Sequence, residues 1–186
     1  MVKVIVRGVR RSEDLQAAQR AGADAVAFVV ESKGDPDNLD ITEAVELARL
    51  TPPFLPAVLV TDTREEARLR RAVGSLHPHA VEFPADIDPL ILADLQISFP
   101  EVKWFARLAP SEYEAFHDGA DALVLVPSSD SLENAAKVAE ATRSRVILGR
   151  VPDAVGLDAA LKEVRPFGVV IPVERVADVA RAKGAA

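Results

Sequence analysis

Short apolar runs rich in β-branched residues alternate with amphipathic segments along the whole chain. An apolar run without polar alternation is typical of a strand buried on both faces of a parallel sheet. The amphipathic segments have the period of helices that pack one side against such a sheet. The pattern predicts strands over residues 2–6, 25–30, 56–60, 80–83, 102–106, 122–126, 146–149 and 168–171. It predicts helices over residues 12–21, 42–50, 64–73, 89–97, 111–118, 131–142, 154–164 and 173–183.

Eight strand–helix units of similar size follow one another in 186 residues, which leaves roughly 23 residues for each unit and only short loops. Each helix then serves as the crossover that two parallel strands require. A doubly wound open sheet uses the same alternation, but units of near-equal size favour closure. No predicted strand is followed by the G-x-G-x-x-G pattern of dinucleotide-binding folds. We therefore expect residues 1–186 to form one domain, a compact α/β (β/α)8 TIM barrel.

A short segment occurs twice in the chain. Residues 22–26 read GADAV and residues 119–123 read GADAL, four units later. In both places glycine ends a predicted helix and a strand follows. The spacing is that of two similar half-barrels, although turns of this kind also arise independently.

Helix starts carry capping and acidic residues. Ser12 is followed by Glu13 and Asp14, and residues 130–133 read DSLE. Both patterns place hydrogen-bond acceptors and negative charge where the helix dipole favours them. We expect helices to begin at these two positions.

Composition excludes several classes of protein. A net charge of -7 leaves no basic footprint for nucleic acid. No apolar run is long enough to span a membrane and no signal peptide opens the chain, so a cytoplasmic location is expected. The absence of cysteine excludes disulfides, thiolate metal sites and cysteine nucleophiles. The single methionine, with few asparagines and glutamines, suggests a heat-adapted source.

In barrel proteins the chemistry lies at the carboxyl ends of the strands. Polar and charged residues follow most of the predicted strands at this end. They are Arg7, Glu31, Ser32, Lys33, Thr61, Asp62, Glu82, Arg107, Ser128, Arg150 and Glu174.

Five segments resemble the phosphoribosylanthranilate isomerase family of tryptophan biosynthesis in order and spacing. They are KVIVRG, AGADAVAFVVESK, AVEFPADIDP, GADALVLV and VRPFGVVI. The resemblance runs from end to end and implies a TIM barrel that carries out an Amadori-type rearrangement. In that reaction a carboxylic acid protonates the ribose ring oxygen and a thiolate removes a proton from the neighbouring carbon.

The residues that the resemblance assigns to this chemistry differ here. The cysteine of the family aligns with Arg7, which stays protonated and is no base. Its aspartate aligns with Val126, which has no proton to give. The glutamine and histidine of another family motif align with Glu82 and Pro84. Both chemical roles are therefore empty at their usual positions.

The phosphate cradle that the resemblance implies is also altered. It aligns with Gly149, Arg150 and residues 172–174, which read PVE. Proline lacks the amide that would bind phosphate, and Glu174 would repel it. Arg150 offers a guanidinium as compensation.

Alternate residues of a strand share a face, so Lys3, Ile5 and Arg7 should point into the barrel. Buried cations need partners, and Glu82 and Glu31 are the expected ones. Lys33 and Arg107 would complete this mixed-charge cluster.

Three hypotheses follow for the mouth of the barrel. The charges neutralise one another and plug a barrel that binds nothing. Alternatively, Arg7, Lys33, Arg107 and Arg150 bind a small anionic or phosphorylated ligand. In the third, isomerase chemistry has moved to carboxylates, with Glu82 and Asp62 as the catalytic candidates beside Glu31. An enzyme needs an open pocket at the mouth, whereas an interaction protein, such as a homo-oligomer, would show a plugged mouth and an apolar patch elsewhere.

Other polar residues favour structural roles, and no cofactor or metal is expected. His77 and His79 precede a strand and lack a third ligand, which indicates a solvated turn. His117 would end a helix, and residues 128–130 would cap the next one. Trp104 and Phe105 are neighbours in one strand, so one should face the barrel and the other the helices.

Overall fold

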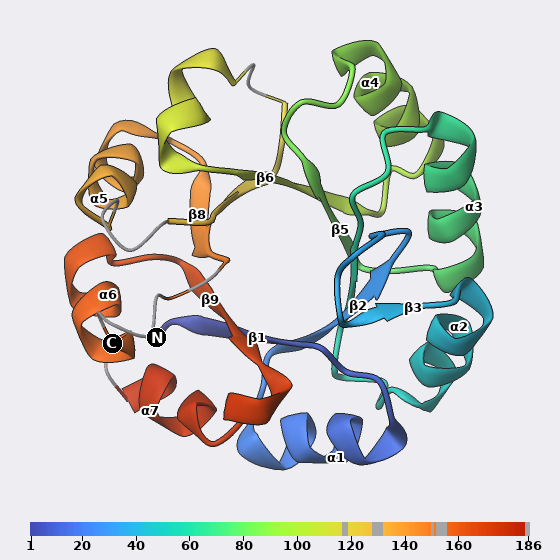
Figure 1. Ribbon diagram of the computed structural model, residues 1–186, viewed down its shortest axis with the longest axis horizontal. Helices are drawn as coiled ribbons and strands as arrows, with labels where there is room; N and C mark the ends of the chain where they lie inside the picture. Colours follow the sequence, from blue (N-terminus) through green and yellow to red (C-terminus); the bar gives the residue numbers. More distant parts are fainter. Residues whose placement is uncertain (117–118, 128–131, 150, 152–155, 185–186) are drawn as a thin grey trace.

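A computed structural model describes residues 1–116, 119–127, 132–149, 151 and 156–184. Its parallel strands form a closed barrel surrounded by helices (Figure 1), because β1 pairs with both β9 and β2. The barrel strands are β1 (Lys3–Arg7), β2 (Ala25–Val30), β4 (Ala57–Val60), β5 (Ala80–Pro84), β6 (Lys103–Leu108), β7 (Ala122–Leu125), β8 (Arg145–Leu148) and β9 (Gly168–Pro172). The predicted TIM barrel is confirmed, with strand ends within two residues of those expected.

Helices connect the strands on the outside of the barrel. They are α1 (Ser12–Ala21), α2 (Ile41–Leu50), α3 (Glu66–Leu76), α4 (Pro89–Ser98), α5 (Leu132–Ala141), α6 (Leu157–Val164) and α7 (Asp178–Gly184). Within the described residues no helix is long and apolar enough to cross a membrane.

Three connections differ from the predicted elements. The short strand β3 (Asn38–Leu39), which was not predicted, pairs with the carboxyl end of β2. Within the described residues, the helix predicted over residues 111–118 is instead a 3-10 turn, η1 (Pro110–Ala115), a tighter form that is common in short connections. The last predicted helix is divided into the 3-10 turn η2 (Val173–Arg175) and α7. Its apolar spacing is unbroken, so the period alone could not show this division.

The hydrophobic core has two layers. A large cluster fills the space between strands and helices, and a smaller one, with Ile5, Ala27, Val124 and Val170 among its members, fills the barrel interior. Trp104 is 1% exposed in the outer layer, whereas Phe105 packs against the inner one. The prediction that these neighbours face opposite sides is confirmed.

The start of α1 is capped differently from the prediction. Arg11 occupies the N-cap position and Ser12 is already helical. The carboxylate of Asp14 instead accepts hydrogen bonds from the backbone amides of Arg10 and Arg11, each at 3.0 Å. An acid inside the first turn thus satisfies the free amides. The other predicted cap, at residues 130–131, lies outside the described residues.

The repeated GAD segment has the same structural role in both places. Asp24 accepts hydrogen bonds from Lys3 Nζ at 3.1 Å and from the backbone amide of Val4 at 2.9 Å. Asp121 accepts hydrogen bonds from Lys103 Nζ at 3.0 Å and from the backbone amide of Trp104 at 2.9 Å. The equivalence supports two similar half-barrels. It also places Lys3 at the amino end of β1, with a half-exposed side chain, so the prediction that Lys3 points into the barrel is wrong.

Candidate functional site

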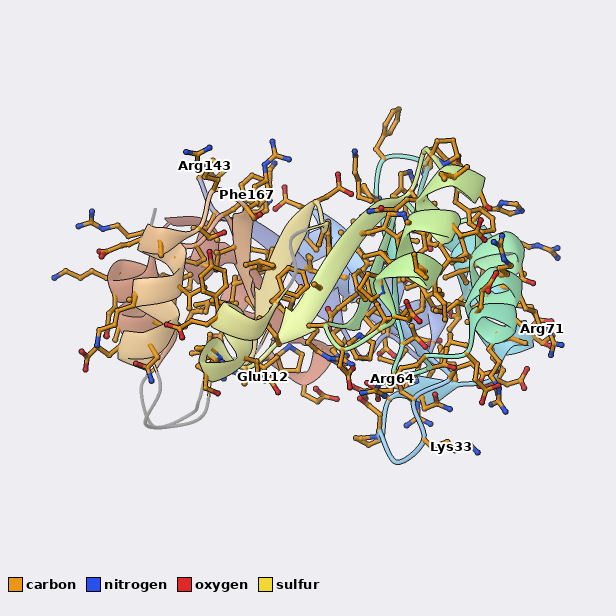
Figure 2. The ribbon with its side chains drawn as sticks, turned by 90° about the horizontal axis from the view of Figure 1, so that it is seen from above. Lys33, Arg64, Arg71, Glu112, Arg143 and Phe167 are labelled. Atoms are coloured by element: carbon orange, nitrogen blue, oxygen red, sulfur yellow. The ribbon has the colours of Figure 1, made fainter. Side chains whose placement is uncertain are left out.

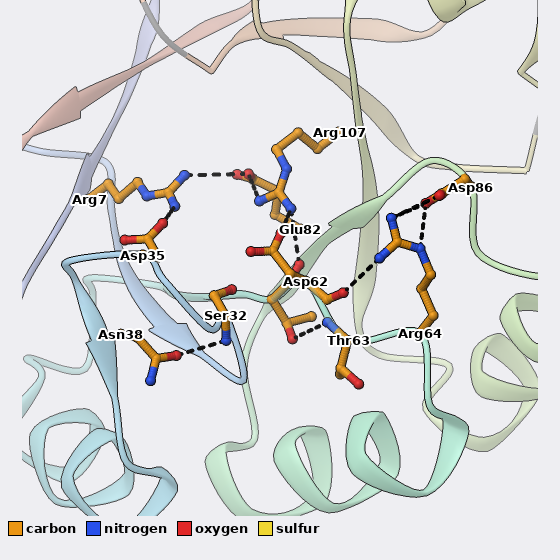
Figure 3. Close-up of polar contacts among 11 residues, drawn as sticks. Arg7, Ser32, Asp35, Asn38, Asp62, Thr63, Arg64, Glu82, Asp86 and Arg107 are labelled. Carbon is orange, nitrogen blue, oxygen red and sulfur yellow. Dashed lines mark hydrogen bonds and ion pairs between the residues drawn. The ribbon is translucent and has the colours of Figure 1, made fainter.

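Two arginines and a buried glutamate meet at the carboxyl ends of the strands. Arg7 ends β1, Glu82 lies within β5, and Arg107 lies near the end of β6. Arg107 Nη1 donates to Glu82 Oε1 at 3.1 Å, and Arg7 Nη1 lies 3.9 Å from the same oxygen (Figure 3). One carboxylate oxygen therefore lies between two guanidinium groups.

Two further carboxylates extend this cluster outward. Arg7 Nη2 donates to Asp35 Oδ2 at 2.5 Å. Arg107 Nη2 pairs with Asp62 and also donates to the carbonyl oxygen of Thr61 at 3.3 Å. The result is an alternating row of charges, Asp35–Arg7–Glu82–Arg107–Asp62, which we call the mouth network (Figure 3).

A short loop after β2 positions Asp35. Its backbone amide donates to the Ser32 carbonyl at 3.1 Å, and the Ser32 amide donates to Asn38 Oδ1 at 2.8 Å. Asp35 Oδ1 in turn accepts the amide of Asp37 at 2.9 Å. The loop is thus held by its own hydrogen bonds and presents both aspartates at the mouth.

Gly8 allows the Asp37 carboxylate to approach the backbone after β1. Its φ of 83° is one that L side chains rarely adopt, and a Cβ there would lie 3.0 Å from Asp37 Oδ2. Burial raises the pKa of Asp37, and the nearby carboxylates of Asp35 and Glu174 raise it further. Arg7 and Arg10 oppose this rise. Negative charge is thus in excess on this side of the mouth.

Glu82 is the most enclosed charge of the mouth network, with a side chain only 4% exposed. Burial raises the pKa of Glu82, while Arg107 and Arg7 oppose the rise. The hydrogen bond from Arg107 and the ion pair with Arg7 both involve Oε1.

A cavity of about 600 Å³ opens beside the mouth network. Arg7, Asp35, Asp62 and Arg107 form part of its wall, but Glu82 does not line it. The opposite wall is largely apolar and contains Val126, Val151, Leu157, Val170 and Ile171. The mouth is therefore partly filled by ion pairs and still open to a small molecule.

Of the predicted mixed-charge cluster, the fold brings together Arg7, Glu82 and Arg107. Asp62, predicted separately as a catalytic candidate, joins them through Arg107. The expected partner Glu31 is not part of this cluster, because a positive φ of 57° takes this residue off the strand and its carboxylate bonds Arg68 Nη1 at 3.0 Å. Arg7 pairs with Asp35 instead.

Lys33 is also outside the mouth network. It is exposed at the tip of its loop and points away from the barrel (Figure 2). Arg150 lies outside the described residues, so its predicted ligand-binding role stays a prediction. Asp35 was missed by the sequence analysis, although the turn-forming residues around Gly34 were a signal that the chain folds back there.

The two histidines before β5 have ordinary structural contacts. His77 ends α3 in a left-handed conformation, and His79 Nδ1 accepts the backbone amide of Ala57 at 3.3 Å. The described part of the chain contains no group of three or more histidine, cysteine or acidic residues that could hold a metal ion. His117 and Ser128 lie outside the described residues.

Sequence comparison finds relatives that share one protein name. The chain is 30% identical over 185 residues to N-(5'-phosphoribosyl)anthranilate isomerase of Halorubrum lacusprofundi, covering 91% of this chain and 85% of the relative. It is 31% identical over 183 residues to the protein of that name from Natronomonas pharaonis, covering 91% and 86%. No family model matches the chain.

Solved structures with the same fold have similar names. N-(5'-phosphoribosyl)anthranilate isomerase from Pyrococcus furiosus superposes with a TM-score of 0.81 at 19% identity, covering 97% of this chain and 99% of that one. A phosphoribosyl anthranilate isomerase in complex with reduced 1-(o-carboxyphenylamino)-1-deoxyribulose 5-phosphate gives a TM-score of 0.76 at 20% identity, covering 99% and 100%. At these identities the superpositions show the fold.

Proposed function

The chain belongs to the phosphoribosylanthranilate isomerase family, and from this premise we propose that it binds a small molecule without carrying out the usual isomerisation. One observation carries the proposal. Arg7, at the position where the resemblance implies a thiolate base, is bonded to Asp35 and lies beside Glu82. A guanidinium held between two carboxylates stays protonated and removes no proton from a ligand.

The position of the acid supports the same proposal. Val126 lines the cavity where the resemblance implies the aspartate that protonates the ribose ring oxygen. Arg7 and Val126, which stand at the positions that the resemblance implies for base and acid, thus both lie on the cavity wall. Because the cavity persists, binding without isomerisation fits the geometry better than a fully plugged barrel.

Isomerisation by relocated carboxylates is the second candidate function. Asp62 lines the cavity, which favours it, but its carboxylate is paired with Arg107. Glu82 lies behind the arginines rather than on the cavity wall. A general base must reach the proton it removes, so the geometry supports this candidate less well.

A turnover assay on phosphoribosylanthranilate tests the proposal. We expect no turnover by the unmodified protein. Turnover by the Arg7→Cys, Val126→Asp double variant above that of either single variant would show that the barrel still admits this substrate and that only the chemistry was lost. Turnover by the unmodified protein that is lost in Glu82→Gln or Asp62→Asn would overturn the proposal in favour of relocated chemistry. Circular dichroism of each variant controls for folding.

A further inference from the structure

Resting on the proposed function, we infer that the cavity takes a small organic cation, an ammonium group on an apolar body, rather than a phosphorylated or carboxylated ligand. Its volume of about 600 Å³ and its place at the strand carboxyl ends are those of a ligand site. The inference concerns which charge that ligand carries.

The apolar wall of the cavity favours a ligand whose uncharged part is apolar. Val126, Val151 and Val170 line the cavity and offer no hydrogen bond through their side chains. Gly149 adds to this wall, because a Cβ there would lie 2.7 Å from Val124 Cγ1 and no side chain fits. Such a surface binds hydrocarbon better than a polyhydroxylated sugar phosphate.

The arginines on the cavity wall are already bonded to carboxylates. Arg7 pairs with Asp35, and Arg107 pairs with Glu82 and Asp62. Arg175 donates through Nε to Asp178 Oδ2 at 2.9 Å. An anionic ligand would have to displace one of these carboxylates, which costs the interactions that the ion pairs supply.

Two carboxylates on the cavity wall have no such partner. Among the described residues, the side chains of Asp37 and Glu174 form no hydrogen bond or ion pair. They repel one another, and Arg7 and Arg10 are the cations whose fields reach Asp37. Arg10 donates to the carbonyl oxygen of Pro36 at 3.1 Å rather than to either carboxylate. An ammonium group on the ligand would neutralise this excess charge.

The end of β9 gives an anion little support. Pro172 has no backbone N–H, and η2 beyond it carries the Glu174 carboxylate. A phosphate at this end would lie near that negative charge.

Calorimetric titration with a matched pair of probes tests the inference. Benzylamine and benzoate share a ring and carry opposite charges, and inorganic phosphate serves as a third probe. We expect benzylamine to bind and to raise the unfolding temperature, with no binding of benzoate or phosphate. The Asp37→Asn, Glu174→Gln double variant should weaken benzylamine binding about tenfold or more.

A control variant separates local contact from overall charge. Glu101→Gln, Glu163→Gln makes the same change in net charge at exposed residues that do not line the cavity, and it should bind benzylamine like the unmodified protein. Stronger binding of benzoate or phosphate, equal weakening in both double variants, or no binding of any probe would overturn the inference. If binding of an anion is lost in Arg150→Gln, that residue is its site. Turnover of phosphoribosylanthranilate would instead overturn the proposed function, so the two failures are distinguishable.

Discussion

Arg7 and Arg107 contact the same oxygen of Glu82 from equivalent positions in the two halves of the barrel. Each arginine stands four residues after a lysine that bonds the aspartate of a GAD segment. Lys103 pairs with Ala80 on β5, and Lys3 pairs with Gly168 on β9. Counting two residues along each strand, Glu82 therefore corresponds to Val170. The internal repeat supplies both arginines, and one half alone supplies the carboxylate between them.

The Glu82→Gln variant should change how stability depends on pH. Because burial raises the pKa of Glu82, the folded protein holds this proton more tightly than the unfolded chain. The contribution of Glu82 to the free energy of unfolding should then fall as pH rises from its ordinary pKa through the raised one. Urea denaturation across this range should show the unmodified protein losing stability relative to Glu82→Gln. A difference that grows in the opposite direction would contradict the prediction.

Replacing Gly8 by alanine should destabilise the fold by about 1–3 kcal/mol, because the backbone there has positive φ and Asp37 lies where the methyl group would go. Urea denaturation measures the loss. An Asp37→Gly change in the Gly8→Ala background should recover the part caused by the contact and leave the part caused by φ. No recovery would mean that backbone strain alone explains the loss.

Asp24→Ala and Asp121→Ala should cost about 1–2 kcal/mol each, because each removes a carboxylate from a lysine and a strand amide. Asp24→Ala should cost the more, because it also removes the ion pair with Lys183. Chemical denaturation at neutral pH compares them directly. Exposed Asp86, which pairs with Arg64 at the mouth face, provides the control and should matter much less when changed to alanine. A larger loss for Asp121→Ala than for Asp24→Ala would contradict this prediction.

The Asp24 contribution should disappear in acid. Burial acts to raise its pKa, but the Val4 amide, Lys183 and Lys3 outweigh this effect and lower it. The stabilisation is therefore complete above the ordinary pKa and is lost as pH falls through the lowered one. Unfolding of the unmodified protein and of Asp24→Ala should converge there.

Trp104, the single tryptophan, should report on barrel packing. It is 1% exposed and its Nε1 bonds no described residue. We expect blue-shifted emission that resists quenching by acrylamide and moves to the red on unfolding. Strong quenching in the native protein would contradict this environment.

Much of the fold could be predicted because a buried parallel strand leaves a clear apolar run. Side chains alternate between the two faces along β1 and β6, which places Arg7 and Arg107 on the face where Glu82 lies. The centre of the mouth network could be predicted for this reason. The alternation fails beyond the strand end, where loop dihedral angles decide direction. Glu31 left the cluster through its positive φ, and Asp35 entered it through hydrogen bonds within its loop. Neither a positive φ nor hydrogen bonds within a loop produce a periodic pattern in the sequence.

The correspondence between Glu82 and Val170 has a consequence for how the cavity is divided. Asp35, Asp37 and Asp62 all come from the first half of the chain, whereas the apolar residues of the opposite wall come from the second. The mouth thus resembles the contact between two unlike subunits that happen to share one backbone. Substitutions in the second half alone can therefore alter the apolar surface, whereas the charge of the cavity depends on both halves, because Arg107 and Glu174 also line it.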